Sequence, residues 1–167
     1  LVSSHGGNMS LRLERGLLIT AHGSRLGHLE EGDLVEVAPG GSPRGEPSMD
    51  TAIHQAIYAA TEAQAVVHAH PVHAVALSLQ PEAQEIRPQD LEGQHYLGTV
   101  PVVARGQDVA EALRQHKIVV VAGHGSYARG NSLWQALQWT SVLEESAQIL
   151  WLRRMLETGP STGSGQG

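Results

Sequence analysis

The most informative stretch of the chain is residues 65–71, Ala65-Val66-Val67-His68-Ala69-His70-Pro71. Its apolar, β-branched start predicts a buried strand, on which residues i and i+2 point to one face, so His68 and His70 aim their imidazoles the same way. A second apolar run, 118–122, leads through Gly123 to His124. If the two strands are neighbours in one sheet, His124 brings a third nitrogen to the same point. Three protein ligands with one open position are typical of a catalytic divalent-metal site.

An ordinary structural role has to be weighed against this hypothesis, because the chain contains 10 histidines. A single histidine beside a strand usually has a structural role, which is what we expect for His5, His28, His54, His73, His95 and His116. The pair at His68 and His70 is different. Two neighbouring imidazoles on a buried strand repel each other when protonated and leave nitrogens without partners when neutral. A metal ion removes both problems.

Composition limits the chemistry. A chain of 167 residues can form one domain with a sizeable core, and a net charge of −6 without a basic run argues against nucleic acid and membrane surfaces as partners. The chain has no apolar stretch of the ~20 residues that a membrane span needs, and we expect a cytoplasmic protein.

Cysteine is absent, so a metal would be held by histidine, carboxylate and water, as zinc and similar divalent ions are. The single lysine, Lys117, lies in a polar run, so a Schiff-base mechanism lacks a candidate and carbonyl chemistry would need a Lewis acid.

The pattern of apolar residues predicts an irregular alternation of strands and helices with a hairpin, which favours a mixed α/β sandwich. We expect the first turn of one helix to place a carboxylate, Asp50, near the metal site, with His54 one turn later on the same face; Glu46 is the other carboxylate nearby. Asp50 would also be explained by the helix dipole alone. The expected strands are 11–13, 17–20, 34–37, 65–70, 101–104, 118–122 and 127–129, and the expected helices are 48–61 with Ser48 as N-cap, 73–79, 109–115 and 133–157.

Five ordered motifs resemble the class II aldolase/adducin family. They are Gly7-Asn8-Met9-Ser10, Ile19-Thr20-Ala21-His22-Gly23, Pro47-Ser48-Met49-Asp50 with His54 and Tyr58, His68-Ala69-His70-Pro71, and His124-Gly125 with Gly130. Within the family, residues 90–97 and 143–150 are most similar to bacterial L-fuculose-phosphate aldolases. The resemblance implies a three-layer α/β/α sandwich around a mostly antiparallel sheet, with residues 1–157 as a single domain that lacks the family's N-terminal helix. We expect the Gly/Ser-rich tail, 158–167, to be disordered.

The resemblance also implies an activity. Zinc, or another divalent cation such as Mn²⁺ or Co²⁺, would be held by His68, His70 and His124. The reaction would be the reversible retro-aldol cleavage of a ketose phosphate, such as L-fuculose 1-phosphate, to dihydroxyacetone phosphate and an aldehyde through a zinc-stabilised enediolate. Asp50 would carry the proton and Tyr96 would line the site, while the phosphate would be bound at Asn8, Gly23 and Ser48. The expected assembly is a homotetramer with its active sites at subunit interfaces.

Several positions depart from the aldolase pattern. Asp50 stands where the aldolases have Glu and the related pentulose-phosphate 4-epimerases have Asp, but the catalytic Asp of those epimerases falls near Gln94. His5 and His22 replace Thr, and Met49 replaces Ser, so the substrate could carry a phosphate, a carboxylate or neither. Two alternatives therefore stay open, namely an epimerase, dehydratase or decarboxylase using the same metal site, and a non-catalytic adducin-like binding or assembly module. The three histidines favour an enzyme.

Overall fold

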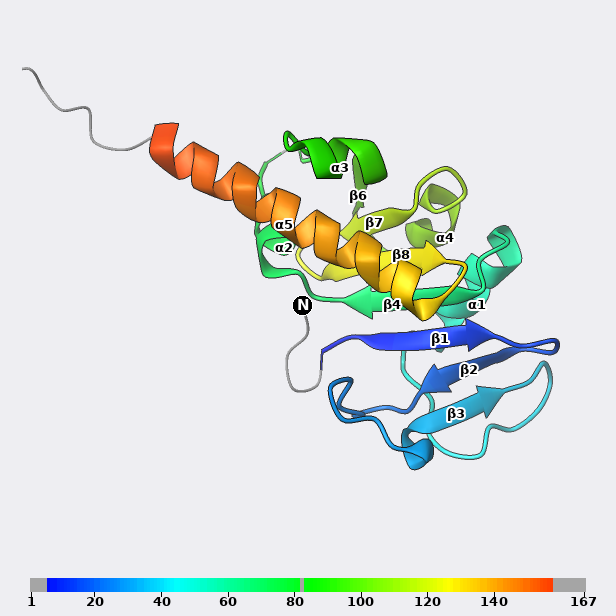
Figure 1. The fold of residues 1–167 in the computed structure, drawn as a ribbon. Helices are drawn as coiled ribbons and strands as arrows, with labels where there is room; N and C mark the ends of the chain where they lie inside the picture. The colour runs from blue at the N-terminus through cyan, green and yellow to red at the C-terminus, as the bar shows by residue number, and fades with distance from the viewer. Residues whose placement is uncertain (1–5, 82, 158–167) are drawn as a thin grey trace, which may run out of the picture.

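The computed structural model describes residues 6–81 and 83–157, so the predicted tail at 158–167 and His5 lie outside the described residues. Its centre is an eight-stranded sheet in the order β3-β2-β1-β4-β8-β7-β6-β5 (Figure 1). β6 and β7 pair in parallel and the other pairs are antiparallel, which confirms the mostly antiparallel sheet. The strands are β1 (Asn8–Arg12), β2 (Leu17–Thr20), β3 (Leu34–Val37), β4 (Ala65–Ala69), β5 (Glu85–Ile86), β6 (Val100–Val103), β7 (Ile118–Val121) and β8 (Gly125–Gly130).

Helices cover both faces of this sheet, as the three-layer prediction requires. The helices are α1 (Thr51–Ala60), α2 (Val72–Ser78), α3 (Leu91–Tyr96), α4 (Val109–Ala112) and α5 (Leu133–Glu157), with short 3₁₀ turns at Glu31–Asp33 and Gly106–Asp108. α5 lies across β8 and β4, as Figure 1 shows, and packs with α2 and α3 on the same face. α1 and α4 contact each other and cover the opposite face.

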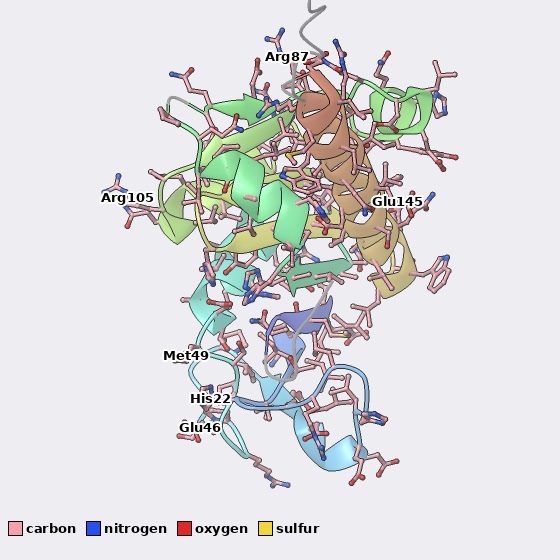
Figure 2. The ribbon with its side chains drawn as sticks, turned by 90° about the vertical axis from the view of Figure 1, so that its left-hand side faces the viewer. His22, Glu46, Met49, Arg87, Arg105 and Glu145 are labelled. Atoms are coloured by element: carbon pink, nitrogen blue, oxygen red, sulfur yellow. The ribbon has the colours of Figure 1, made fainter. Side chains whose placement is uncertain are left out.

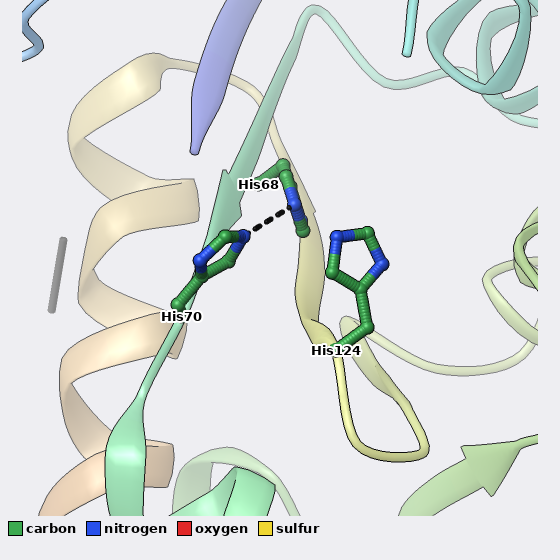
Figure 3. Close-up of side chains that lie close together, drawn as sticks. All are labelled: His68, His70 and His124. Atoms are coloured by element: carbon green, nitrogen blue, oxygen red, sulfur yellow. Dashed lines mark hydrogen bonds between the residues drawn. The ribbon is translucent and has the colours of Figure 1, made fainter. Parts of the chain in front are cut away.

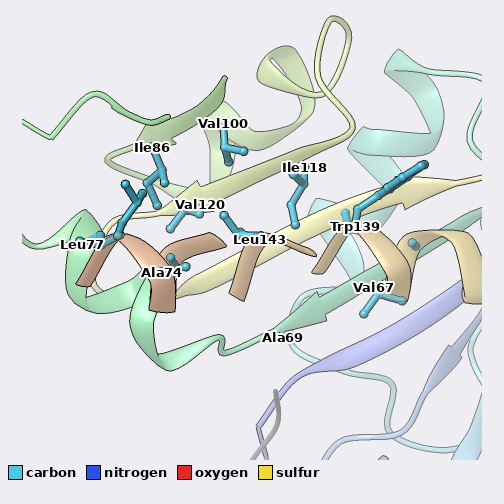
Figure 4. Close-up of a cluster of buried hydrophobic side chains, with 14 residues drawn as sticks. Val67, Ala69, Ala74, Leu77, Ile86, Val100, Ile118, Val120, Trp139 and Leu143 are labelled. Atoms are coloured by element: carbon cyan, nitrogen blue, oxygen red, sulfur yellow. The ribbon is translucent and has the colours of Figure 1, made fainter. Parts of the chain in front are cut away.

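Strand β7 shows how the sequence directs this layering. Side chains alternate between the two faces of a strand. Ile118 and Val120 accordingly enter the core under α5, beside Leu143 and Trp139 (Figure 4), while Val119 and Val121 enter the core under α1 and α4. A run that is apolar at every position can be buried on both faces at once. The same pattern in β4 places Val67 and Ala69 on one side and Val66 on the other.

Two elements were missing from the sequence prediction, α3 and β5, which lie in the segment between α2 and β6. The sequence of α3 shows no clear apolar periodicity. Its N-terminus is stabilised by a cap, because the Asp90 side chain accepts a hydrogen bond from Gly93 N at 2.7 Å. Gly93 also lets the helix approach α5, since a Cβ there would lie 2.2 Å from Ser146 Oγ. Tertiary packing therefore stabilises a helix that local propensity does not reveal.

The start of α1 also differs from its prediction. The helix begins at Thr51 with Asp50 as its N-cap, so the prediction of Ser48 in that position was wrong. Ser48 still contributes to the turn, because its Oγ accepts a hydrogen bond from Asp50 N at 3.3 Å and its carbonyl accepts one from Thr51 N at 3.1 Å. α4 begins at residue 109 as predicted, but it ends at Ala112 instead of residue 115. Across the described residues, no helix is both long and apolar enough to cross a membrane.

Candidate metal centre

His68 and His70 lie at the end of β4, and His124 lies in the turn between β7 and β8. The strands before these histidines lie in one sheet but are not direct neighbours, because β8 lies between β4 and β7. The short turn after β7 instead returns the chain beside β4, where Ala69 pairs with Ser126. One nitrogen from each ring lies within 4.8 Å of the others, and Figure 3 shows the three imidazoles facing a common point.

The turn that carries His124 is fixed by backbone contacts. His124 N donates to Val121 O at 3.0 Å, and Gly123 adopts a φ of +69°, a conformation that residues with a Cβ rarely take. Gly123 N also donates to the buried Ser78 Oγ of α2 at 3.0 Å. The position of the third histidine is therefore determined by the turn and by the helix packed beside it.

The protonation pattern of His68 suits a metal ligand. Its Nδ1 lies 2.9 Å from Ser126 O, a group that can only accept, so Nδ1 carries the proton and Nε2 offers a lone pair. Backbone carbonyls commonly fix a metal-binding histidine in this way. His68 Nε2 lies 3.0 Å from His70 Nε2 (Figure 3), and a shared cation would satisfy both nitrogens. The donor set therefore fits a divalent ion that accepts nitrogen ligands.

The pKa values of these histidines favour the neutral form that binds metals. Burial lowers the pKa of His68 to about 4, and burial followed by the nearby His124 lowers the pKa of His70. Both rings are therefore unprotonated near pH 7, so a metal ion would not compete with protons for their nitrogens.

Asp50 supplies a carboxylate at the edge of the cluster. Its Oδ2 accepts a hydrogen bond from Asn8 Nδ2 at 2.7 Å and lies 3.7 Å from His68 Nε2. Burial acts to raise the pKa of Asp50, but the Asn8 amide, His68 and the Tyr127 hydroxyl outweigh it, so the pKa is lower than usual. Asp50 is thus a carboxylate at neutral pH.

A cleft of about 340 Å³ opens over this cluster. It brings together the three histidines, Asp50 and the predicted phosphate-binding residues Asn8, Gly23 and Ser48. His22 and Met49, two of the positions that depart from the aldolase pattern, also line it, and Figure 2 shows them on one side of the molecule with Glu46. The remaining lining residues are Gly7, Ala21 and Ser24.

Tyr96, the other predicted catalytic residue, does not line this cleft. It packs on the core under α5, where its ring centre lies 5.9 Å from that of Trp139 and its carbonyl accepts a hydrogen bond from Lys117 Nζ at 2.6 Å. Gln94 is exposed and donates to Gln89 O at 2.9 Å. Glu46 is exposed as well, and only its carbonyl is engaged, by His22 N at 2.8 Å.

Three residues around the site were given no role in it by the sequence analysis. A Cβ on Gly125 would lie 2.5 Å from Ala69 O, 2.8 Å from His70 Cδ2 and 2.9 Å from His68 Cε1. Tyr127 stacks on His68 with ring centres 4.2 Å apart, and His54, expected to be ordinary, is fully buried beside it. Gly125 belongs to the motif His124-Gly125, but the motif alone does not show that a side chain there would meet the ligand rings. Tyr127 and His54 are brought in by pairing between distant segments.

We predict that Gly125→Ala weakens zinc binding, because the new methyl group meets backbone and two ligand rings at distances that cannot be relieved by rotating a flexible side chain. Overpacking of this kind typically costs about 1–3 kcal/mol of unfolding free energy. Isothermal titration with zinc and thermal unfolding measure the two effects. Gly27→Ala is the matched control, since nothing lies within 4 Å of a Cβ there. Equal zinc affinity in the two variants would contradict the geometry.

We also predict that the zinc-free protein loses stability as the pH falls from 6.5 towards 4. Burial lowers the pKa of His54 from 6.5 to about 3 and that of His68 from 6.5 to about 4. Between these values and pH 6.5, the two histidines are protonated in the unfolded chain but not in the folded protein. Stabilisation is complete above pH 6.5 and declines below it by roughly 1.4 kcal/mol per pH unit for each such histidine. Urea unfolding at a series of pH values measures the slope.

In that experiment, His54→Gln should flatten the slope by about one proton, because it removes one of the two buried rings. A free energy of unfolding that is constant between pH 6.5 and 4 would contradict the neutral, buried state of these rings.

Comparison with known proteins gives a consistent family. A model of the class II aldolase and adducin N-terminal domain matches residues 1–151. The methylthioribulose-1-phosphate dehydratase of Serratia proteamaculans is 34% identical, with 91% of this chain and 86% of that protein aligned. The 3-oxo-tetronate 4-phosphate decarboxylase of Escherichia coli is also 34% identical, with 87% of this chain and 76% of that protein aligned.

Among solved structures, the L-fuculose-1-phosphate aldolase of Thermus thermophilus superposes with a TM-score of 0.89 at 42% identity, over 96% of this chain and 90% of that one. The family model covers most of the sequence, and these relatives align along most of their own length. The chain therefore belongs to the class II aldolase and adducin family.

Proposed function

We propose that this protein is a metal-dependent lyase that acts on a small sugar phosphate in the cleft above the three histidines. The observation that carries the proposal is the convergence of one nitrogen from each of His68, His70 and His124 within 4.8 Å, with the Asp50 carboxylate 3.7 Å from His68 Nε2. Three converging imidazoles beside an ionised carboxylate have no evident structural purpose, whereas this set suits a catalytic ion with an open position.

The three histidines would hold the ion, with zinc as the proposed metal and Mn²⁺ or Co²⁺ as alternatives. A divalent cation at this point supplies a Lewis acid for the carbonyl oxygen and the neighbouring hydroxyl oxygen of a ketose phosphate. The chain's own contribution is to keep His68 neutral and oriented, through burial of its ring and the hydrogen bond from its Nδ1 to Ser126 O.

Asp50 is the proposed proton carrier. In a retro-aldol cleavage, it takes the proton of the hydroxyl group whose carbon becomes the aldehyde, while the C–C bond breaks. The electron pair stays on the dihydroxyacetone phosphate half until a proton is delivered to that carbon. Asp50 is ionised and within reach of the cluster, so it can accept and return this proton.

The phosphate of the substrate would be bound by Asn8, Gly23 and Ser48. None of the described residues that line the cleft is Lys or Arg, so the anion would be held by neutral donors and by His22. His22 is exposed and can donate from its ring, whereas Met49 is 84% exposed and presents an apolar side chain at the edge of the cleft. This composition favours a substrate with one anionic end and an apolar substituent.

A neighbouring copy of the chain is part of the proposal. Tyr96 packs away from the cleft of its own chain, so it can line an active site only when it is presented by another subunit. The last turns of α5 leave Trp151, Leu152, Met155 and Leu156 exposed, which would be costly in an isolated chain. We propose a homotetramer with active sites at its subunit interfaces, in which such side chains are covered.

Retro-aldol cleavage is the first candidate reaction, because the Thermus thermophilus relative named as an aldolase is 42% identical. Dehydration is the second, because curated relatives of 34% identity carry that name. Both reactions, and decarboxylation of a 3-oxo acid, place an electron pair on the carbon next to a carbonyl, so one site can serve any of them.

The test is a parallel assay of the zinc-loaded protein with L-fuculose 1-phosphate, ribulose 5-phosphate and methylthioribulose 1-phosphate. Retro-aldol activity releases dihydroxyacetone phosphate, which a coupled NADH assay detects, and dehydration or epimerisation is followed by proton NMR. We expect dihydroxyacetone phosphate from L-fuculose 1-phosphate. Turnover of methylthioribulose 1-phosphate alone would select the second candidate. Inactivity with all three and with a 3-oxo-tetronate 4-phosphate would contradict the lyase.

Two variants serve as controls in this assay. Asp50→Asn should keep the fold and bind zinc but lower kcat by roughly 100-fold or more, because the proton carrier is lost. His70→Ala should abolish activity together with zinc binding. Full activity in Asp50→Asn would transfer the role of proton carrier to another group.

A further inference from the structure

Behind Asp50 lies a group of buried polar side chains whose pairing is incomplete. Among the described residues, five buried side-chain polar atoms lack a hydrogen-bond partner, and three of them, Asn8 Oδ1, His54 Nε2 and the Tyr127 hydroxyl, belong to residues around this one carboxylate. Buried polar atoms are almost always paired, so unpaired ones that gather at one place call for an explanation. Their gathering around Asp50 points to a role in holding this carboxylate.

Tyr127 is the most constrained member of this group. Its side chain is fully buried, and its ring stacks on His68 at an interplanar angle of 16°, so the hydroxyl oxygen cannot move without breaking the stack. Burial and the adjacent negative charge of Asp50 raise the pKa of Tyr127, so the hydroxyl keeps its proton and is available as a donor. It lies close enough to Asp50 to lower the pKa of that carboxyl.

His54 borders the same space from α1. Its Nδ1 lies 2.7 Å from Ser10 Oγ, which fixes the ring, and its centre lies 6.1 Å from that of Tyr127 in an edge-on arrangement. The other ring nitrogen, Nε2, is one of the unpaired atoms. His54 is thus held in place beside Tyr127, and Asp50 is the charged acceptor near the Tyr127 hydroxyl.

We propose that Tyr127 is a positioning residue, whose hydroxyl donates a hydrogen bond to the Asp50 carboxylate and holds it at a set distance from the three histidines. Asn8 binds Asp50 Oδ2 from the cleft side at 2.7 Å, and Tyr127 approaches from the buried side. With one donor on the cleft side and one on the buried side, the carboxylate is held in one orientation beside the cluster. The kinetic part of this inference rests on the proposed lyase activity, but the hydrogen bond itself does not.

The first experiment needs no activity. In proton NMR of the zinc-free protein, a buried hydroxyl bonded to a carboxylate gives a slowly exchanging low-field resonance, which Tyr127→Phe identifies by its loss. We expect this resonance to shift or disappear in Asp50→Ala, because its acceptor is gone. Tyr58→Phe is the matched control, since it removes a buried hydroxyl that lies 2.8 Å from Ser10 Oγ instead. A Tyr127 resonance that is unchanged in Asp50→Ala, or no slowly exchanging resonance, would overturn the proposal.

The second experiment separates positioning from structure. Tyr127→Phe keeps the ring on His68, so zinc affinity and KM should stay within about 2-fold, while kcat should fall roughly 10- to 100-fold. In the Asp50→Asn background the same substitution should cost nothing further, because the two residues act as one unit. An equal loss in both backgrounds, or a loss of zinc affinity that matches the loss of kcat, would contradict the positioning role.

A wild-type protein that turns over none of the proposed substrates would refute the lyase and leave the NMR experiment to decide on the hydrogen bond. An active wild type with an unaffected Tyr127→Phe variant would refute the positioning role and leave the lyase intact. The two proposals therefore fail in different ways.

Discussion

The antiparallel pairing of β4 with β8 is the interaction on which the candidate site depends. Its register places His68 opposite Tyr127 and Ala69 opposite Ser126. This register brings the Ser126 carbonyl to His68, which it orients, and stacks the Tyr127 ring on His68. It also places the turn with His124 beside the end of β4. A shift of one residue would reverse the face of every side chain in β8 and separate these groups.

The rest of the fold buries polar side chains of the site. Two apolar layers bury His68 and His54, and burial lowers the pKa of both rings, so the chain holds unprotonated imidazoles near an ionised carboxylate. Gly125 makes room for this arrangement, since a side chain there would occupy the space of the ligand rings. The cleft, the neutral nitrogens and the carboxylate together give the features that a catalytic metal centre needs.

Sequence reasoning recovered the parts of this account that depend on local pattern. The two-residue spacing of His68 and His70, the apolar runs of β4 and β7, and the place of Asp50 at the start of α1 were visible, and the family and the three-layer fold are confirmed. The order of strands was not predicted, because nothing in a strand's own sequence says that β8 separates β4 from β7. The roles of Tyr127 and His54 were missed for the same reason. Tyr127 interacts with Asp50 and His54 with Ser10, and both partners are far away in the sequence. The site roles assigned to Tyr96, Asn8, Gly23 and Ser48 stay predictions.

The central claim is that the three histidines hold one divalent ion, and the most direct measurement is zinc content after equilibrium dialysis. Protein stripped with a chelator, dialysed against zinc and analysed by atomic emission should contain about one ion per chain, whereas His70→Ala treated in parallel should contain almost none. Wild-type protein without zinc, or His70→Ala with as much zinc as the wild type, would contradict the account.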